Sequence, residues 1–287
     1  MATLDTLPVL PLSLIIGAVK AALDEDLGRA GDITSAATIP ADATATAAFV
    51  ARKPGVVSGL PIVECTFREV DPSILFLPEL RDGDPVAAGG VIARVEGNAR
   101  GVLAAERVAL NYLCHLSGIA TATAALVERV AHTKARILDT RKTTPGLRVF
   151  EKYAVRCGGG ANHRFGLHDA VLIKDNHIAV AGGVAEAIRK ARAAVGAGVK
   201  VEVEVGSLAE LDEAMSERPD IVMLDNMSLD EMREAVRRVA GRAVTEASGN
   251  VTLETVAAIA ETGVDTISSG WITHSAPALD IGLDVEV

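Results

Sequence analysis

The segment Ala170-Val-Leu-Ile-Lys-Asp-Asn-His177 decides the fold, because a short apolar run ends there abruptly in charged and polar side chains. Five other runs in the second half of the chain end in a similar way: Ala135–Lys142, Val199–Glu204, Ile221–Asn226, Val244–Gly249 and Thr266–Gly270. Segments of helical length lie between most of them, namely Val184–Ala194, Leu208–Ser216, Asp230–Val239 and Leu253–Thr262. This repeat of strand, loop and helix predicts an α/β fold with a parallel sheet.

The carboxyl ends of parallel strands meet on one rim, which is where α/β barrels place their chemistry. Two of the six runs end in basic side chains, at Arg141, Lys142 and Lys174, and two end in acidic ones, at Glu204 and Asp225. The last two end in small and hydroxyl residues, Ser248-Gly249-Asn250 and Ser268-Ser269-Gly270. A rim with basic side chains on one part, carboxylates on a second and Ser/Gly residues on a third would suit a ligand that combines several negative charges with a sugar.

Composition narrows the class of protein. The chain has 287 residues, of which 49% are hydrophobic, and a net charge of −10, so we expect a globular enzyme that does not bind nucleic acid. The apolar stretch Leu7–Val19 is interrupted by prolines and lacks a basic flank, and it therefore predicts neither a signal peptide nor a membrane span. Cys65, Cys114 and Cys157 match no zinc spacing, which favours free thiols in the cytoplasm.

The first part of the chain has a different pattern. Leu12–Leu27 has helical periodicity, with Ser13 as the expected N-cap and Gly28 as the stop. Thr44–Val57 and Val86–Val95 predict strands, so a small α+β domain should precede the sheet of parallel strands. The turns between Gly83 and Gly97 also resemble a lipoyl or biotinyl carrier module, but no lysine lies in a hairpin there.

An amphipathic helix joins the two parts. Its expected buried stripe comprises Ala105, Val108, Ala109, Tyr112, Leu113 and Leu116. Arg107 lies off this stripe, and helix position alone favours a surface arginine paired with a nearby acid.

The loop Gly158-Gly-Gly-Ala-Asn-His163-Arg164 follows a helix that we expect to begin at Thr144-Pro145. One glycine suffices to cap that helix. The other two would let backbone amides approach an anion, next to the cationic side chains of His163 and Arg164.

Seven motifs in register resemble quinolinate phosphoribosyltransferase, from about residue 13 to about residue 283. They are Asp26-Leu-Gly-x-x-Gly-Asp-Ile-Thr34, Glu106-Arg-Val-Ala-Leu-Asn111 followed by Ser117-Gly-Ile-Ala-Thr121, Asp139-Thr-Arg-Lys-Thr143, Gly158-Gly-Gly-x-x-His-Arg164, Leu224-Asp-Asn226, Glu246-Ala-Ser-Gly249 and Glu261-Thr-Gly-Val-Asp265. That family converts quinolinate and phosphoribosyl pyrophosphate to nicotinate mononucleotide, pyrophosphate and CO₂, with Mg²⁺, in NAD biosynthesis.

The resemblance implies an incomplete α/β barrel of about six parallel strands beside an N-terminal α+β sandwich domain. We expect the sandwich domain to span 1–117, with the tail 276–287 packed on it, and the barrel to span 118–275. It also implies a cytoplasmic homodimer, or a hexamer, in which the N-terminal domain of one subunit covers the barrel of its partner. No nucleic acid or membrane is expected as a partner.

The resemblance further assigns roles to individual residues. Arg141, His163 and Arg164, with Arg107 from the neighbouring subunit, would hold the two carboxylates of quinolinate. Lys142 and Lys174 would act near the reacting centre, and Glu204 and Asp225 would contact the ribose hydroxyls and, through water, Mg²⁺. The expected 5′-phosphate cradle comprises Ser248, Gly249, Asn250, Ser269, Gly270 and Trp271, and Thr140 and His274 complete the substrate-binding set. Residue 271 is often a small alanine in this family, so Trp271 departs from its pattern.

Two other functions fit parts of the sequence. A barrel lyase or aldolase could use Lys174 as a Schiff base, although it would not require the acidic pair or the Ser/Gly loops. A homologue with another substrate, such as the related protein encoded in molybdate-transport loci, would share the fold.

Overall fold

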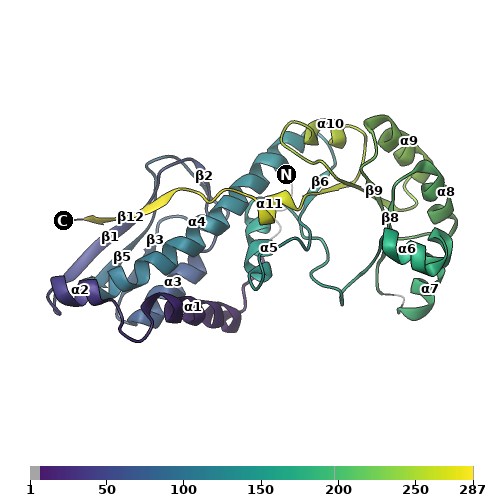
Figure 1. Cartoon of the computed structure of the whole chain (residues 1–287). Coiled ribbons are helices and arrows are strands. Elements are labelled where there is room, and N and C mark those ends of the chain that lie inside the picture. The colour runs from purple at the N-terminus through teal and green to yellow at the C-terminus, as the bar shows by residue number, and fades with distance from the viewer. Residues whose placement is uncertain (1–6, 197, 287) are drawn as a thin grey trace. The chain divides into compact units, whose positions relative to one another are not determined.

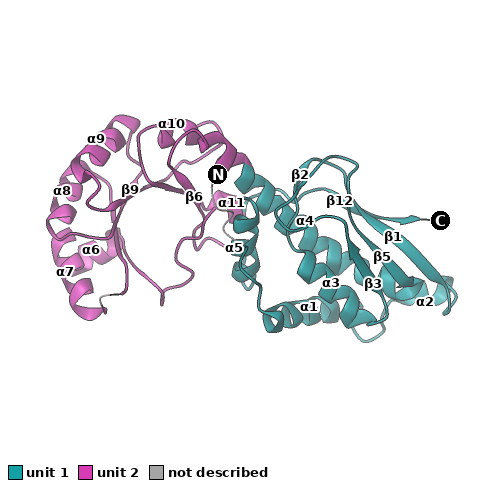
Figure 2. Cartoon of the chain, turned by 180° about the vertical axis from the view of Figure 1, so that it is seen from behind, with its two compact units in different colours: residues 1–124, 144–159, 275–287 teal, residues 125–143, 160–274 magenta. Residues whose placement is uncertain are grey.

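The computed structural model describes residues 7–196 and 198–286, which divide into two compact units (Figures 1 and 2). The first unit comprises the chain up to residue 124 together with 144–159 and 275–286, and the second comprises 125–143 and 160–274. The chain thus passes between the units several times.

The first unit contains an antiparallel sheet in the order β12-β1-β5-β3 and a separate pair of short strands, β2 and β4. Its strands are β1 (Thr44–Ala51), β2 (Gly55–Val56), β3 (Leu75–Pro78), β4 (Pro85–Val86), β5 (Val91–Asn98) and β12 (Ile281–Glu286). The helices that begin in it are α1 (Leu12–Leu27), α2 (Ile33–Thr38), α3 (Leu60–Val70), α4 (Ala99–Val130) and α5 (Arg148–Cys157). The C-terminal strand β12 pairs with β1 along its length.

One hydrophobic core joins the sheet of the first unit to α3 and α4. Phe49 of β1 meets Phe67 of α3 edge to face, with ring centroids 6.0 Å apart, and Leu113 of α4 is fully buried in the same cluster. Among the described residues, α4 is the one helix whose length and apolar composition would allow it to cross a membrane, and half of that apolar stretch is buried in the protein. This burial is typical of a core helix.

The second unit is a six-stranded sheet in the order β6-β11-β10-β9-β8-β7, with every neighbouring pair parallel. Its strands are β6 (Arg136–Leu138), β7 (Val171–Ile173), β8 (Val201–Val205), β9 (Ile221–Asp225), β10 (Val244–Ser248) and β11 (Thr266–Ser268). Its helices are α6 (Asp175–Ala181), α7 (Val184–Ala194), α8 (Leu208–Ser216), α9 (Leu229–Val239), α10 (Val256–Ala260) and α11 (Trp271–His274). Figure 2 shows the helices α6 to α10 on the outside of the curved sheet. The predicted six-stranded, incomplete α/β barrel is confirmed.

Local chemistry explains where these helices begin. Ser207 and Ser228 cap α8 and α9, and the Ser228 hydroxyl accepts from the Glu231 amide while the Glu231 carboxylate accepts from the Ser228 amide. The amphipathic periodicity of the sequence also predicts the bounds of α1, α7 and α8 correctly, and those of α9 to within one residue.

Three predictions about helix ends are wrong, and the predicted strands Thr44–Val57 and Val86–Val95 are each divided into two strands. Pro11, not Ser13, is the N-cap of α1, so Ser13 lies inside the helix. The helix before the glycine loop begins at Arg148 rather than at Thr144-Pro145. The segment Leu253–Thr262 is helical only over α10, because its first residues form a hydrogen-bonded turn in which the Thr252 amide donates to the Thr255 hydroxyl.

Two glycines test this packing in opposite directions. A Cβ at Gly118 of α4 would lie 2.2 Å from the Pro277 carbonyl oxygen, whereas a Cβ at Gly17 of α1 meets nothing within 4 Å. We expect Gly118→Ala to lower the free energy of unfolding by about 1–3 kcal/mol through overpacking, and Gly17→Ala to raise it by about 0.5–1 kcal/mol. Urea unfolding measures both, and equal effects of the two substitutions would contradict the packing described.

Candidate active site

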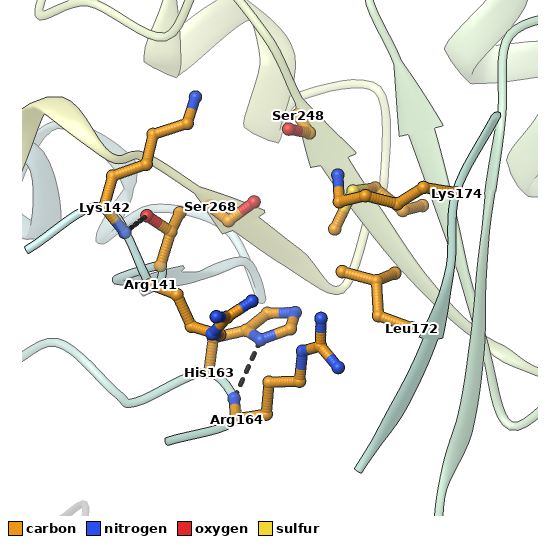
Figure 3. Close-up of a pocket in the computed structure, with 10 residues that line it drawn as sticks. Arg141, Lys142, His163, Arg164, Leu172, Lys174, Ser248 and Ser268 are labelled. Carbon is orange, nitrogen blue, oxygen red and sulfur yellow. Dashed lines mark hydrogen bonds between the residues drawn. The ribbon is translucent and has the colours of Figure 1, made fainter. Parts of the chain in front are cut away.

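A cavity of about 290 Å³ opens at the carboxyl ends of the barrel strands. It is lined by Thr140, Arg141, Lys142, His163, Arg164, Leu172, Lys174, Met223, Ser248 and Ser268. Figure 3 shows Arg141, His163 and Arg164 gathered on one side, while Lys142 and Lys174 extend from opposite sides. The structure thus brings the predicted basic residues of the second unit together with Thr140 and Ser248.

Backbone pairing places His163 and Arg164 beside Arg141. Ala161 forms a parallel bridge with Leu138 at the end of β6, and its amide donates to the Ile137 carbonyl at 2.8 Å. The fully buried Asp139 then accepts a hydrogen bond from the His163 amide at 2.8 Å. The loop therefore continues the sheet edge and carries its cationic side chains to the strand ends.

The glycines of this loop serve the packing. A Cβ at Gly158 would lie 2.3 Å from the Ala120 carbonyl oxygen of α4, and Gly159 has a φ of +83°. Both positions thus require glycine for steric reasons. None of the three glycines lines the cavity of about 290 Å³, so their contact with an anion stays a prediction.

The acidic residues line a second recess. Asp175, Glu204, Glu210 and Asp225 surround a cavity of about 330 Å³, together with Ile178, Ala179 and Gly206. We call this cavity the acidic recess and the cavity of about 290 Å³ the cationic cavity. The Lys174 ammonium, which lines the cationic cavity, forms an ion pair with Glu204 of the acidic recess. The predicted pair Glu204 and Asp225 therefore lies in one recess, as the strand-end argument requires.

The predicted phosphate cradle is divided between two places. Gly249 and Asn250 line a cavity of about 340 Å³ with Asn226, whose side-chain oxygen accepts from the Asn250 amide group at 3.2 Å. Gly270 packs so closely against Thr140 and Lys142 that a Cβ would lie 2.7 Å from Lys142 Cδ.

The other cradle residues lie around α11. Ser269 is buried, and its amide donates to the Leu138 carbonyl at 3.0 Å. Trp271 and His274 are the first and last residues of α11, and Trp271 is 37% exposed.

Arg107 belongs to the first unit. Its side chain is 62% exposed on α4 and forms an ion pair with Glu106, with the nitrogen and oxygen 3.8 Å apart. The expected buried stripe of this helix is present, except that Tyr112 is only partly buried.

Sequence reasoning missed two buried carboxylates near the cationic cavity. Glu202 of β8 and Glu246 of β10 are 3% and 1% exposed, and they lie 3.0 Å and 3.7 Å from Nε2 of His163. Alternation in Val201-Glu-Val-Glu-Val205 could have revealed Glu202, because it shares a strand face with Glu204. Leu172 and Met223, also missed, give the cavity apolar walls that fit a planar ring.

Burial controls the ionisation of this cluster. Burial, together with the nearby charge of Glu202, raises the pKa of Glu246 to about 7, against the opposing effect of His163. Burial and the positive charge of Arg141 lower the pKa of Arg164, whereas Glu202 raises it.

Comparison with known proteins identifies the family. Residues 119–284 match the family described as quinolinate phosphoribosyl transferase, C-terminal domain, and residues 32–117 match the N-terminal domain of the same family. The chain belongs to the quinolinate phosphoribosyltransferase family. The N-terminal match includes Gly83–Gly97, so no separate carrier module is needed to explain those turns.

Similar proteins cover nearly the whole chain. A nicotinate-nucleotide pyrophosphorylase [carboxylating] of Mycobacterium leprae is 47% identical over 272 residues, which are 93% of this chain and 95% of that protein. Quinolinate phosphoribosyltransferase [decarboxylating] 1b of Nicotiana tabacum is 44% identical and covers 97% and 84% of the two chains. The solved structure of the nicotinate-nucleotide pyrophosphorylase from Francisella tularensis has a TM-score of 0.94 at 41% identity, covering 98% and 99%.

The raised pKa of Glu246 predicts a pH-dependent stability. Unfolding returns this carboxyl to about its ordinary pKa of 4.5, so the unfolded state releases its proton first as the pH rises, and the folded state loses stability between pH 4.5 and about 7. Glu246→Gln removes this titration. We expect the free energy of unfolding of the variant, relative to the original chain, to rise by about 1–3 kcal/mol from pH 4.5 to pH 8.

Urea unfolding of both proteins at each pH measures this difference. A difference that stays constant across the range would show that Glu246 ionises as an ordinary carboxyl.

Proposed function

We propose that this chain transfers the phosphoribosyl group from phosphoribosyl pyrophosphate to quinolinate and releases pyrophosphate and CO₂, giving nicotinate mononucleotide for NAD biosynthesis. The single observation that carries the proposal is the cavity at the strand ends that gathers Arg141, Lys142, Arg164 and Lys174 around apolar walls. Membership in the quinolinate phosphoribosyltransferase family supports the same reaction.

Quinolinate is a planar ring with two adjacent carboxylates. Arg141 and Arg164 lie on one side of the cavity, and a guanidinium binds a carboxylate through two parallel hydrogen bonds. We assign one carboxylate to each arginine, with His163 beside them. Leu172 and Met223 would contact the faces of the ring.

The phosphoribosyl donor would occupy the remaining rim. Lys142 and Lys174 would bind pyrophosphate, and Ser248, Gly249 and Asn250 would bind the 5′-phosphate with Ser269, Gly270 and Trp271. Gly249 has a φ of +96° and Asn250 one of +50°, a turn in which successive backbone amides can face an anion.

Magnesium fits the acidic recess. Carboxylate oxygens are the ligands that Mg²⁺ prefers, and a cavity of about 330 Å³ leaves room for the water that this ion keeps. Glu204 and Asp225 would hold it through water and would also bind the ribose hydroxyls. When bound, Mg²⁺ supplies positive charge that neutralises phosphate oxygens.

Charge development then determines what each residue does. Departure of pyrophosphate leaves positive charge on the anomeric carbon, which Glu204 and Asp225 stabilise, while Lys142 and Lys174 stabilise the departing anion. The pyridine nitrogen attacks the anomeric carbon and becomes cationic. The ring then accepts the electron pair of the bond to the adjacent carboxylate, so CO₂ leaves and the ring carbon takes a proton.

We also propose that the protein is a cytoplasmic homodimer, or a hexamer made of three such dimers, with shared sites. Arg107 supports this arrangement, because it is exposed on α4 and belongs to the family motif that begins at Glu106. In this arrangement the Arg107 guanidinium enters the cationic cavity of the partner subunit.

The lyase alternative is weaker. A Schiff-base lysine must be neutral to attack a carbonyl, whereas Lys174 is ion-paired with Glu204. Failure of borohydride to trap a carbonyl substrate on Lys174 would agree with the transferase.

A comparison of quinolinate with nicotinate as the acid substrate tests the proposed function. We expect turnover of quinolinate with release of CO₂ that depends on phosphoribosyl pyrophosphate, and a kcat/KM for nicotinate at least tenfold lower, because the missing carboxylate leaves an arginine without its charged partner at a cost of about 1.5–3 kcal/mol. Release of pyrophosphate measures turnover of both acids, and release of labelled CO₂ measures the decarboxylation of quinolinate. Comparable turnover of the two acids, or none of quinolinate, would contradict the proposal.

Subunit exchange tests the shared site. Arg107→Ala and Arg141→Ala should each be nearly inactive alone, yet a mixture should recover roughly a quarter of the original activity, because half of the dimers are mixed and half of their sites carry neither substitution. Each variant refolded alone is the control. A mixture without recovered activity would place Arg107 outside the partner's site.

A further inference from the structure

Both ring nitrogens of His163 are engaged by the protein itself. Nδ1 accepts a hydrogen bond from the Arg164 amide at 2.8 Å, and Nε2 lies 3.0 Å from the Glu202 carboxylate. Because the amide N–H can only donate, Nδ1 must carry the lone pair and Nε2 the proton. His163 therefore donates to Glu202.

Glu202 also supports the charge of Arg164. Burial and the neighbouring Arg141 both disfavour the charged guanidinium, and the negative charge of Glu202 opposes them. Arg164 donates through Nη1 to the Ala170 carbonyl at 3.0 Å, while its buried Nε has no hydrogen-bond partner among the described residues. A buried N–H without a partner is costly, so this side of the guanidinium is suited to an incoming anion.

Glu246 provides a comparison within the same cluster. It is as deeply buried as Glu202, but its nearest oxygen is 3.7 Å from His163 Nε2, beyond hydrogen-bond distance. Of the two glutamates, therefore, only Glu202 lies within hydrogen-bond distance of the imidazole.

We propose that Glu202 is a positioning residue for the substrate dicarboxylate. Its hydrogen bond fixes the His163 ring, and the ring in turn fixes the Arg164 amide through Nδ1. The position of this amide sets the direction of the Arg164 guanidinium. This inference rests on the proposed function for the identity of the dicarboxylate. It changes the expected role of His163 from a direct carboxylate ligand to the link between Glu202 and Arg164.

Charge alone predicts the opposite effect. Removing a buried negative charge near a cationic cavity should strengthen anion binding, whereas removing a positioning contact should weaken it. The sign of the change therefore distinguishes the two roles.

The kinetic test uses three variants. Glu202→Met keeps the size and loses the acceptor, Glu202→Gln keeps an acceptor for the imidazole N–H, and Glu246→Met makes the matched change without the hydrogen bond. We expect Glu202→Met to raise the KM for quinolinate by at least about tenfold with less than about threefold change in the KM for phosphoribosyl pyrophosphate. The other two variants should stay within about threefold of the original KM for quinolinate.

Two kinetic outcomes would overturn the proposal. One is an unchanged or lower KM for quinolinate in Glu202→Met, and the other is an equal rise in Glu246→Met, which would indicate general damage to the barrel interior.

Nitrogen NMR of the histidine-labelled original protein gives a second test that needs no variant and no turnover. The proposal predicts a neutral His163 ring protonated at Nε2, both alone and with quinolinate added. An imidazolium, or a ring protonated at Nδ1, would overturn it even if the protein is active. If instead quinolinate is not turned over while the Nε2–H form is present, the proposed function fails and the link from Glu202 to Arg164 stands.

Discussion

The structure depends on holding several positive charges together in a partly buried cavity. Arg141 and Arg164 repel one another, and burial further disfavours the charge of Arg164. Buried carboxylates in the barrel interior stabilise this arrangement. Asp139 accepts a hydrogen bond from the His163 amide, and Glu202 accepts one from the His163 imidazole. A cavity lined by Arg141, Lys142, Arg164 and Lys174 attracts a polyanion.

The parallel sheet makes this arrangement possible. Six strands that share one direction bring β6, β7 and β8 to a common rim, and the loop from Gly160 to Arg164 extends that rim by pairing beside β6. The acidic recess lies at the ends of β8 and β9, and Lys174 bonds to its Glu204. Neighbouring strand ends thus supply a cavity lined by basic side chains and a recess lined by acidic ones within one unit.

Much of this could be predicted from the sequence, because strand and helix periods record which faces are buried. The six runs and most of their helices follow from the strand–loop–helix repeat, and the convergence of Lys142, Lys174 and Ser248 follows from parallel strands that end on one rim. The first residues of α1 and α5 could not be predicted in the same way. Near Ser13 and Thr144 more than one residue could serve as the N-cap, and neighbouring prolines and turns decide between them. Alternation could have revealed that Glu202 shares a strand face with Glu204, but local sequence does not show that strands β8 and β10 direct two carboxylates at one histidine.

The central claim is that the cationic cavity of the barrel is the quinolinate site. A crystal structure of the protein with quinolinate bound tests it most directly. We expect one carboxylate on Arg141 and the other on Arg164, with the ring in contact with Leu172 and Met223 and the contact from His163 to Glu202 kept. Quinolinate bound elsewhere, for example in the cavity of Asn226 and Asn250, would contradict it.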